Sequence, residues 1–366
     1  MELGIIGVAR SGKTSLFNAV TRGSATVGAY SSTSEPNVGV VRVPDVRVDA
    51  LSEIFQPKRV TYAEIRWVDY PVAGFGPDGP DGPDGRFVAE LAQLDALVQV
   101  VRAFEDPAVA HAEGSVDPHR DLETLELELQ FSDLALIERR IQRIASEMRS
   151  VKAGERGELE RHQQLMQCMQ AHLEGGQGLR SLQLNEAEER ELRNYRFVTR
   201  LPELLIINIG EDQLADAAAI EAEFSERYSV HGVAVATLCA KIEAELATVE
   251  LGEAAEFRAE LGLTEESPLD RAIGLAYDLL GLQSFLTAGE DECRAWPVAK
   301  GATAPEAAGK IHTDLERGFI RAEVAGYADL MDAGSMAELK KRGQLRTEGK
   351  AYVVQDGDVL NILFNV

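Results

Sequence analysis

The chain contains 366 residues, which is long enough for two or three domains with sizeable hydrophobic cores. Hydrophobic residues make up 45% of it and charged residues 27%, as in an ordinary soluble globular protein. The formal net charge of −24 at pH 7 disfavours indiscriminate binding to nucleic acid, which requires a basic surface. We therefore expect no DNA binding.

The sequence also bears on location. No apolar run reaches the roughly 20 residues that a membrane-spanning helix requires, and segment 1–7 lacks the basic start and long apolar stretch of a signal peptide. The cysteines Cys168, Cys239 and Cys293 are far apart and form no C-x-x-C pair, which argues against a zinc site or a disulfide framework. We expect a cytoplasmic, monomeric protein with no membrane association.

Short apolar runs alternate with helical stretches along the first hundred residues. A helix is predicted to begin at 15–20, and two later apolar runs repeat the pattern of a strand followed by a helix. The predicted strands are 2–6, 37–43, 63–68, 96–101, 203–208 and 233–237. Strands separated by helices run parallel, so the pattern indicates an α/β fold with a parallel sheet covered on both faces.

Residues 120–198 interrupt this sheet and have a helical pattern. Their apolar side chains recur at intervals of three and four, which predicts an antiparallel coiled-coil arm with a break at 152–157. The seam consists of Leu134, Ile137, Ile141, Ile144, Met148, Val151, Leu159, Met166, Met169 and Leu173. Segment 139–161 carries 7 Lys/Arg against 4 Glu, whereas 201–280 carries 17 Asp/Glu against 4 Lys/Arg. Either the arm touches a polyanion such as a ribosome, or its charges form a solvated helix face.

The clearest chemical motif is Gly7-Val8-Ala9-Arg10-Ser11-Gly12-Lys13-Thr14, which fits G-x-x-x-x-G-K-[ST] between a predicted strand and a predicted helix. In such a P-loop, glycines let backbone N–H groups turn toward the phosphates, and the helix N-terminus adds the positive end of its dipole. Lys13 is expected to reach the β- and γ-phosphates, and the Thr14 hydroxyl to ligate Mg²⁺. The sequence therefore predicts a site for a nucleoside triphosphate.

Two further residues are candidates for the metal side of this site. Asp69 follows the predicted strand 63–68 and suits the role of holding Mg²⁺ directly or through water, although an aspartate after a strand also commonly forms a turn or cap. Thr33 lies in a Ser-rich segment and is the candidate switch residue that senses the γ-phosphate through Mg²⁺. The predicted metal-binding set is Thr14, Thr33 and Asp69.

Base recognition is expected after the strand at 203–208. Asn208 stands where G proteins carry the Asn of N-K-x-D, but Ile209 replaces the Lys and Glu211 replaces the Asp. An Asp there pairs with two donor groups of guanine that adenine lacks, and the longer Glu side chain loses that bidentate geometry. The sequence thus predicts weakened selectivity for guanine, with ATP as the alternative to GTP.

These motifs, with further segments in the C-terminal part, resemble the YchF / Obg-like ATPase family over nearly the whole chain. Besides the P-loop and Asn208 to Glu211, the matching segments are EPNVGVV at 35–41, CAKIEAE at 239–245, FLTAGE at 285–290, APEAAG at 304–309, IHTD at 311–314, GFIRAE at 318–323 and VQDGDV at 354–359. The resemblance implies an α/β P-loop NTPase G domain in two parts, 1–120 and 199–280. It also implies a helical coiled-coil insertion at 121–198 and an α+β, ubiquitin-like TGS domain at 281–366.

The resemblance implies a function and site residues as well. It implies slow hydrolysis of ATP in preference to GTP with Mg²⁺, and association with ribosomes or ribosomal RNA. Lys13 and His111 would be catalytic. His111 matches a histidine of the family that is linked to catalysis, although a lone histidine in a loop is otherwise unremarkable. The nucleotide-binding residues would be Gly7, Arg10, Ser11, Gly12, Lys13, Thr14, Ser15, Asn208, Glu211, Cys239, Ala240 and Lys241, with Asn208 and Glu211 as base readers.

Three features near the phosphates depart from the family pattern. Arg10 stands where the family usually has an Asn that, in related G proteins, helps to hold a catalytic K⁺; its fixed charge could replace the ion, or the side chain could face solvent. Val72 fills the Gly position of D-x-x-G after Asp69, so sensing of the γ-phosphate is expected to change. Three Gly-Pro-Asp copies from Gly76 onward predict an extended polar loop.

Two functions of different classes remain open. The chain is either a nucleotide-hydrolysing switch, with GTP as the alternative substrate to ATP, or a nucleotide-binding adaptor with little turnover. No glutamine follows Asp69 where many G proteins orient the attacking water, so hydrolysis should be slow.

The C-terminal residues 281–366 are predicted to form a small mixed sheet with a packed helix. Strands are expected at 292–298, 319–324, 351–355 and 359–364, and helices near 303–312 and 336–342. The expected core residues are Trp296, Phe319, Ile320, Val353, Leu360 and Ile362. A candidate basic face for RNA or protein consists of Lys300, Lys310, Arg317 and Arg321.

Overall fold

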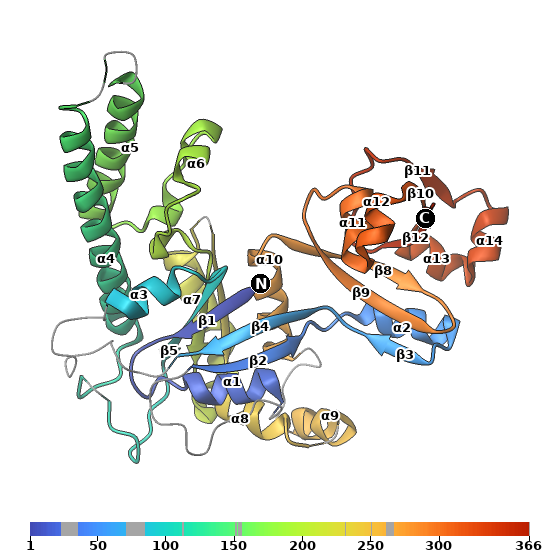
Figure 1. The fold of residues 1–366 in the computed structure, drawn as a ribbon. Helices are drawn as coiled ribbons and strands as arrows, with labels where there is room; N and C mark the ends of the chain where they lie inside the picture. The colour runs from blue at the N-terminus through green and yellow to red at the C-terminus, as the bar shows by residue number, and fades with distance from the viewer. Residues whose placement is uncertain are drawn as a thin grey trace. The chain divides into compact units, whose positions relative to one another are not determined.

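A computed structural model describes residues 1–22, 36–70, 85–111, 113–150, 152, 156–230, 232–249, 251–260 and 267–365. These residues form two compact units (Figure 1). The first unit is Met1–Gly39 with Arg66–Ala272, and the second is Val40–Ile65 with Ile273–Val366. Within the described ranges, no helix has the length and apolar character needed to cross a membrane.

The first unit is built on a six-stranded sheet. Its strand order is β2-β4-β1-β5-β6-β7, and the pairs β4–β1, β1–β5, β5–β6 and β6–β7 are parallel. The strands are β1 (Glu2–Ile6), β2 (Asn37–Arg42), β4 (Glu64–Asp69), β5 (Ala96–Arg102), β6 (Glu203–Asn208) and β7 (Val233–Leu238). Every residue of β5 and β6 is buried, as expected for central strands of a parallel sheet with both faces covered. The six strands predicted for this region are confirmed to within a residue or two at either end.

Helices and short turns connect these strands. Apart from the arm and the helix that follows it, the α-helices of the first unit are α1 (Lys13–Thr21), α3 (Gly85–Leu91), α7 (Ala217–Tyr228), α8 (Ala240–Leu246) and α9 (Leu251–Glu260). Its 3-10 helices are η1 (Leu179–Ser181), η2 (Val198–Arg200) and η3 (Glu211–Asp216). One buried cluster, which includes Ile6, Val68, Leu91, Leu97 and Leu125, joins the sheet to α3 and to the base of the arm.

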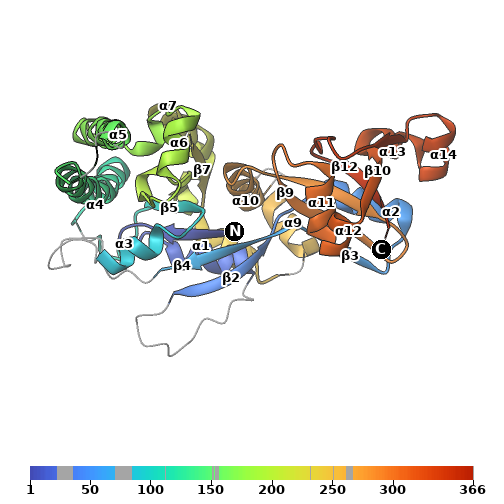
Figure 2. The ribbon, with the colours of Figure 1, turned by 45° about the horizontal axis from the view of Figure 1, so that its top comes forward.

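The arm consists of α4 (Pro118–Glu147) and α5 (Arg156–Glu174), which lie side by side in both views (Figures 1 and 2). Helix α4 begins where the Asp117 side chain accepts from the Arg120 backbone N–H and a proline occupies the first turn. The predicted seam is confirmed where Ile137, Ile144 and the two methionines of α5 are buried together, whereas Val151 lies outside the described residues. Helix α6 (Glu186–Leu192) follows α5.

The second unit contains a mixed six-stranded sheet of order β11-β10-β12-β8-β9-β3. The pairs β10–β11, β10–β12 and β8–β9 are antiparallel, whereas β12–β8 and β3–β9 are parallel. Its strands are β3 (Arg59–Thr61), β8 (Leu282–Ala288), β9 (Glu292–Ala299), β10 (Phe319–Gly326), β11 (Arg346–Glu348) and β12 (Asp358–Phe364). The helices are α2 (Val46–Phe55), α10 (Pro268–Leu279, mostly in this unit), α11 (Ala304–Ile311), α12 (Thr313–Arg317), α13 (Tyr327–Ala333) and α14 (Met336–Lys341).

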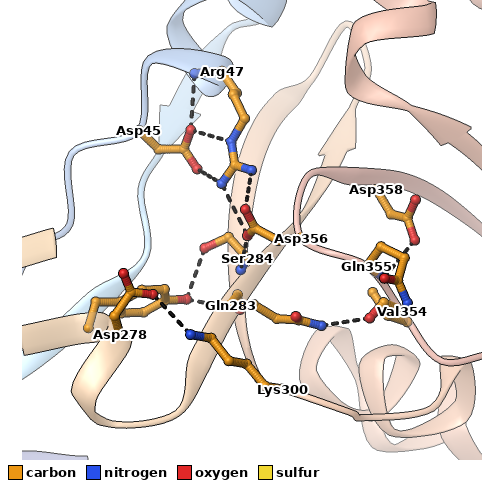
Figure 3. A network of polar contacts seen from close by, with 11 residues as sticks. Asp45, Arg47, Asp278, Gln283, Ser284, Lys300, Val354, Gln355, Asp356 and Asp358 are labelled. Atoms are coloured by element: carbon orange, nitrogen blue, oxygen red, sulfur yellow. Dashed lines mark hydrogen bonds and ion pairs between the residues drawn. The ribbon is translucent and has the colours of Figure 1, made fainter. Parts of the chain in front are cut away.

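Residues 40–65 join the C-terminal residues although they are far away in the sequence. Strand β3 pairs with β9, and Arg47 is held by two carboxylates (Figure 3). The Arg47 guanidinium lies 2.8 Å from the Asp45 carboxylate and 2.7 Å from that of Asp356, which also accepts from the Ser284 backbone N–H at 3.0 Å. Charge-assisted hydrogen bonds of this kind are about twice as strong as neutral ones, so they fix this segment within the second unit.

Three C-terminal predictions were wrong. Residues 351–355 form no strand; Val353 makes only an isolated bridge to Thr303, and its side chain is 42% exposed because the neighbouring Val354 occupies the core. Ile320 is 49% exposed because the register between β10 and β12 shifts between Phe319 and Arg321 and turns the side chain outward. Phe319 and Leu360 are buried as predicted.

Candidate functional site

The loop from Gly7 to Gly12 connects β1 to α1 and has the backbone that the motif predicts. Gly7 has φ 149° and Gly12 has φ 100°, a region that disfavours side chains. A Cβ at Gly7 would come within 2.4 Å of the Val100 carbonyl oxygen, and one at Gly12 within 2.1 Å of the Asn208 amide nitrogen. The loop is thus packed directly against β5 and β6, and both positions require glycine.

Lys13 lies inside this loop rather than on the surface. Its ammonium donates to the carbonyl oxygens of Gly7 and Val8, each at 2.8 Å, and the residue is 5% exposed. Burial lowers the pKa of the Lys13 ammonium to about 8, while the neighbouring Asp69 carboxylate acts in the opposite direction. A cation buried against carbonyl oxygens is suited to exchange one of them for a phosphate oxygen.

Thr14 and Asp69 meet at the carboxyl ends of β1 and β4. The Thr14 hydroxyl donates to the Asp69 carboxylate at 3.2 Å. Asp69 is 4% exposed, and burial raises the pKa of its carboxyl, opposed by hydrogen bonds from Thr14 and Asn37 and by the charge of Lys13. A hydroxyl and a carboxylate are the hard oxygen ligands that Mg²⁺ takes from protein, with phosphates and waters supplying the rest. The residues present therefore fit Mg²⁺.

The other predicted loop residues differ in their surroundings. Ser11 is fully buried, and its hydroxyl oxygen has no hydrogen-bond partner among the described residues, whereas Ser15 is exposed in the first turn of α1. Arg10 has φ 62°, unusual for a residue with a side chain, and its guanidinium donates to the Ala110 carbonyl oxygen at 2.9 Å. Arg10 therefore links the P-loop to the segment that precedes His111.

Asn208, at the end of β6, is buried and holds two loops together. Its amide nitrogen donates to the Ser11 carbonyl oxygen at 2.8 Å, and its amide oxygen accepts from the Ala240 backbone N–H at 2.9 Å. Cys239 is the residue before α8 and is buried, and burial raises the pKa of its thiol. The amide of Asn208 keeps one N–H and one lone pair beyond these two bonds, because each amide has two of each.

Two of the residues expected near the base, Glu211 and Lys241, lie at the surface. The carboxylate of Glu211 and the ammonium of Lys241 form an ion pair at 2.7 Å, with side-chain exposures of 55% and 70%. Ile209, which replaces the Lys of N-K-x-D, is buried among core residues instead of facing the site. The Glu211 carboxylate therefore already has a cationic partner.

His111 lies in the segment that precedes α4, and its side chain is buried. Its Nε2 lies 2.8 Å from an Asp121 carboxylate oxygen, and its Nδ1 accepts from the Glu113 backbone N–H at 3.1 Å. These partners assign the proton to Nε2, and the His111 and Asp121 side chains are each 3% exposed. Asp121 also accepts from the Arg120 guanidinium at 2.8 Å. Both ring nitrogens are thus occupied in this conformation.

Some predicted features lie outside the described residues: Thr33, Val72 and the three Gly-Pro-Asp copies. Conversely, sequence reasoning missed Asp121, the partner of His111. An acidic residue in the first turn of a helix is usually a favourable helix-dipole contact, so no sequence signal distinguished it.

Three comparisons place the chain among known proteins. The family model YchF-GTPase_C, described as "Protein of unknown function (DUF933)", matches residues 282–365. The "Ribosome-binding ATPase YchF" of Bacillus subtilis (strain 168) is 40% identical over 369 residues, covering 100% of both chains. Its counterpart from Escherichia coli O157:H7 is 38% identical and covers 100% of this chain and 99% of the other. The solved structure of the Schizosaccharomyces pombe YchF GTPase has a TM-score of 0.86 at 29% identity, covering 99% of this chain and 97% of that one.

Proposed function

The chain belongs to the YchF family, and from that premise we propose that it is a P-loop nucleoside triphosphatase. It binds ATP with Mg²⁺, hydrolyses it slowly and associates with the ribosome. The observation that carries this proposal is the convergence of Lys13, Thr14 and Asp69 at the carboxyl edge of the parallel sheet. Ligands bind at that edge in open α/β folds.

Each residue of the site has a distinct role. Lys13 exchanges its carbonyl partners for the β- and γ-phosphates, and Gly7 and Gly12 let the loop backbone approach them. Thr14 and Asp69 would hold Mg²⁺, which supplies charge neutralisation at the phosphates when bound. Ser11 and Ser15 complete the phosphate side, and Thr33 is proposed as the third metal-side residue.

The nucleotide preference is proposed from the base side. A Glu211 carboxylate paired with Lys241 is poorly placed to receive the two donors of guanine, and buried Ile209 offers no cation beside the base. Asn208, with Cys239 and Ala240, shapes the pocket through its bonds to both loops. This arrangement favours ATP over GTP, because adenine does not require that carboxylate.

His111 is proposed as the residue that assists attack on the γ-phosphate. Its imidazole is held by Asp121 and the Glu113 backbone, so it must leave this position to act. Slow turnover follows if that release is infrequent. The same observation supports the second candidate, a nucleotide-binding adaptor with little hydrolysis.

Further proposals concern the role of Arg10, the location and oligomeric state of the protein, and its domain boundaries. Arg10 supplies the positive charge for which related G proteins use K⁺, although its present partner is the Ala110 carbonyl oxygen. We propose a cytoplasmic monomer. The proposed divisions are a G domain at 1–120 and 199–280, the arm at 121–198 and a TGS domain at 281–366, with residues 40–65 packing within the second compact unit.

Phosphate release from ATP and from GTP tests the proposal, measured with Mg²⁺ in K⁺ or Na⁺, with and without ribosomes. ATP should turn over faster than GTP, and Lys13→Ala should abolish both activities. Arg10→Ala should abolish the K⁺-independent part. Equal rates for Lys13→Ala and the wild type would exclude the P-loop as the active site, and nucleotide binding without turnover would favour the adaptor.

A further inference from the structure

A small hollow of about 200 Å³ lies in the first unit around the segment that follows α6. It is lined by three arginines, Arg193, Arg196 and Arg200, together with Glu189 and the apolar Ala92 and Phe197. Helix α6 is next to α5 in both views (Figures 1 and 2). The proposed nucleotide site uses none of these residues.

The three arginines differ in their partners. Arg200 makes two hydrogen bonds to the Glu189 carboxylate, at 2.9 and 2.8 Å. Arg193 and Arg196 are exposed, and within the described residues neither guanidinium group has a hydrogen bond or an ion pair. Two guanidinium groups at the hollow are therefore available to a ligand, and the third is held in place beside them.

The backbone that carries these side chains is anchored. The backbone N–H groups of Val198 and Thr199 donate to the buried Asp133 carboxylate at 3.1 and 2.8 Å. The Tyr195 hydroxyl lies 3.1 Å from the His162 imidazole of α5. Because the backbone is fixed, a ligand at Arg193 and Arg196 does not bear the cost of ordering this loop.

The residues that line the hollow carry an excess of positive charge, with three arginines against Glu189. Residues 193–200 contain three arginines and no acidic residue, whereas the chain has a net charge of −24. Arg193 and Arg196, which have no carboxylate partner among the described residues, each present several N–H donors in a planar fork. That arrangement suits phosphate oxygens, which arginine binds in a bidentate manner.

We propose that this arginine hollow binds the phosphate backbone of ribosomal RNA. The inference rests on the proposed association with the ribosome and identifies the surface that makes it. An acidic protein is repelled by a polyanion over most of its surface, so contact requires a locally basic site with unpaired cations. In the basic stretch of the arm, Arg143 and Arg156 are paired with Glu147 and Glu160, and the exposed Arg139, Arg149 and Arg161, which have no ion pair among the described residues, are spread along the arm rather than gathered at one hollow.

The test compares binding to purified bacterial 70S ribosomes by sedimentation over a range of salt concentrations. Arg193→Gln/Arg196→Gln removes two phosphate contacts, so the slope of log affinity against log salt should fall by about 1.4 to 1.8. Affinity at 0.15 M salt should then fall by roughly 10- to 30-fold. The charge-matched control Lys340→Gln/Lys350→Gln alters two exposed lysines of the second unit that lie outside the candidate basic face, and it should bind like the wild type. All proteins should bind ATP equally.

A photo-crosslinking residue at the exposed Asn194, between the two arginines, identifies the class of partner. Crosslinks to ribosomal RNA are expected. Crosslinks to ribosomal protein alone, unchanged binding by Arg193→Gln/Arg196→Gln, or equal losses in the control would each overturn the inference. A wild-type protein that does not bind ribosomes would instead refute the proposed ribosome association, and the inference with it.

Discussion

Asn208→Ala is expected to destabilise the first unit and to weaken binding of both nucleotides. Asn208 is 4% exposed and bonds the Ser11 carbonyl oxygen at 2.8 Å and the Ala240 backbone N–H at 2.9 Å. A buried polar group left without its partner costs about 1–3 kcal/mol. Two such groups therefore give a loss of about 2–6 kcal/mol in the free energy of unfolding, with the lower end applying if water enters.

The two tryptophans make this loss measurable unit by unit. Trp67 is fully buried in β4 of the first unit, and Trp296 lies in the second. In a Trp296→Phe background, urea unfolding followed by fluorescence reports the first unit alone. Asn194→Ala removes an exposed Asn and is the matched control, with an expected change within about 0.5 kcal/mol.

Nucleotide binding gives the second readout. Because Asn208 positions the P-loop, the affinities for ATP and for GTP should fall by the same factor. We expect a fall of roughly tenfold or more, which corresponds to a loss of about 1.4 kcal/mol or more in binding free energy. Stability and affinities equal to those of the wild type would refute the reasoning. A loss confined to one nucleotide would show that Asn208 acts by reading the base rather than by holding the loops.

Three further predictions concern charged groups. Burial lowers the pKa of Lys13 to about 8, and a bound phosphate favours the charged form of the ammonium. The affinity for ATP should therefore fall as the pH rises through 8. A Lys13→Arg variant that still binds ATP should lose this pH dependence, because arginine stays charged. Asp121→Asn should raise ATP turnover severalfold, because an amide holds the His111 imidazole less tightly than a carboxylate does. Reduced turnover would show instead that Asp121 assists catalysis. The control is Asp117→Asn, at the cap of α4. Arg47→Ala should destabilise the second unit by about 1–3 kcal/mol in a Trp67→Phe background. Lys58→Ala, which breaks an exposed pair with Asp291, should cost under about 1 kcal/mol, and equal costs would contradict the assigned role of Arg47.

The part of the fold that the sequence predicts is encoded locally. The P-loop is a contiguous motif between a buried strand and a helix, and the arm repeats its apolar spacing over many residues, so both are visible without tertiary information. The strand at 319–324 was also predicted, but not its irregular register, which exposes Ile320. A register shift depends on the partner strand, which a local pattern does not specify.

The rest depends on contacts between distant residues. Strand β3 has three residues and pairs with β9 more than 230 positions later, so residues 59–61 carry no local sign of membership in the second unit. Asn208 was predicted as a base reader from its place after a strand, but its bonds to Ser11 and Ala240 follow only from the assembled sheet. Likewise, only the folded structure shows that Arg200 is paired with Glu189, whereas Arg193 and Arg196 at the same hollow have no carboxylate partner among the described residues.

Equilibrium binding of labelled ATP and GTP to the wild type and to Lys13→Ala, with Mg²⁺, tests the central claim most directly. The account predicts measurable binding with ATP tighter than GTP, and loss of both in Lys13→Ala because the buried ammonium is the phosphate ligand. Tighter binding of GTP would contradict the assignment of the base side at Glu211. Binding that persists unchanged in Lys13→Ala would contradict the site itself.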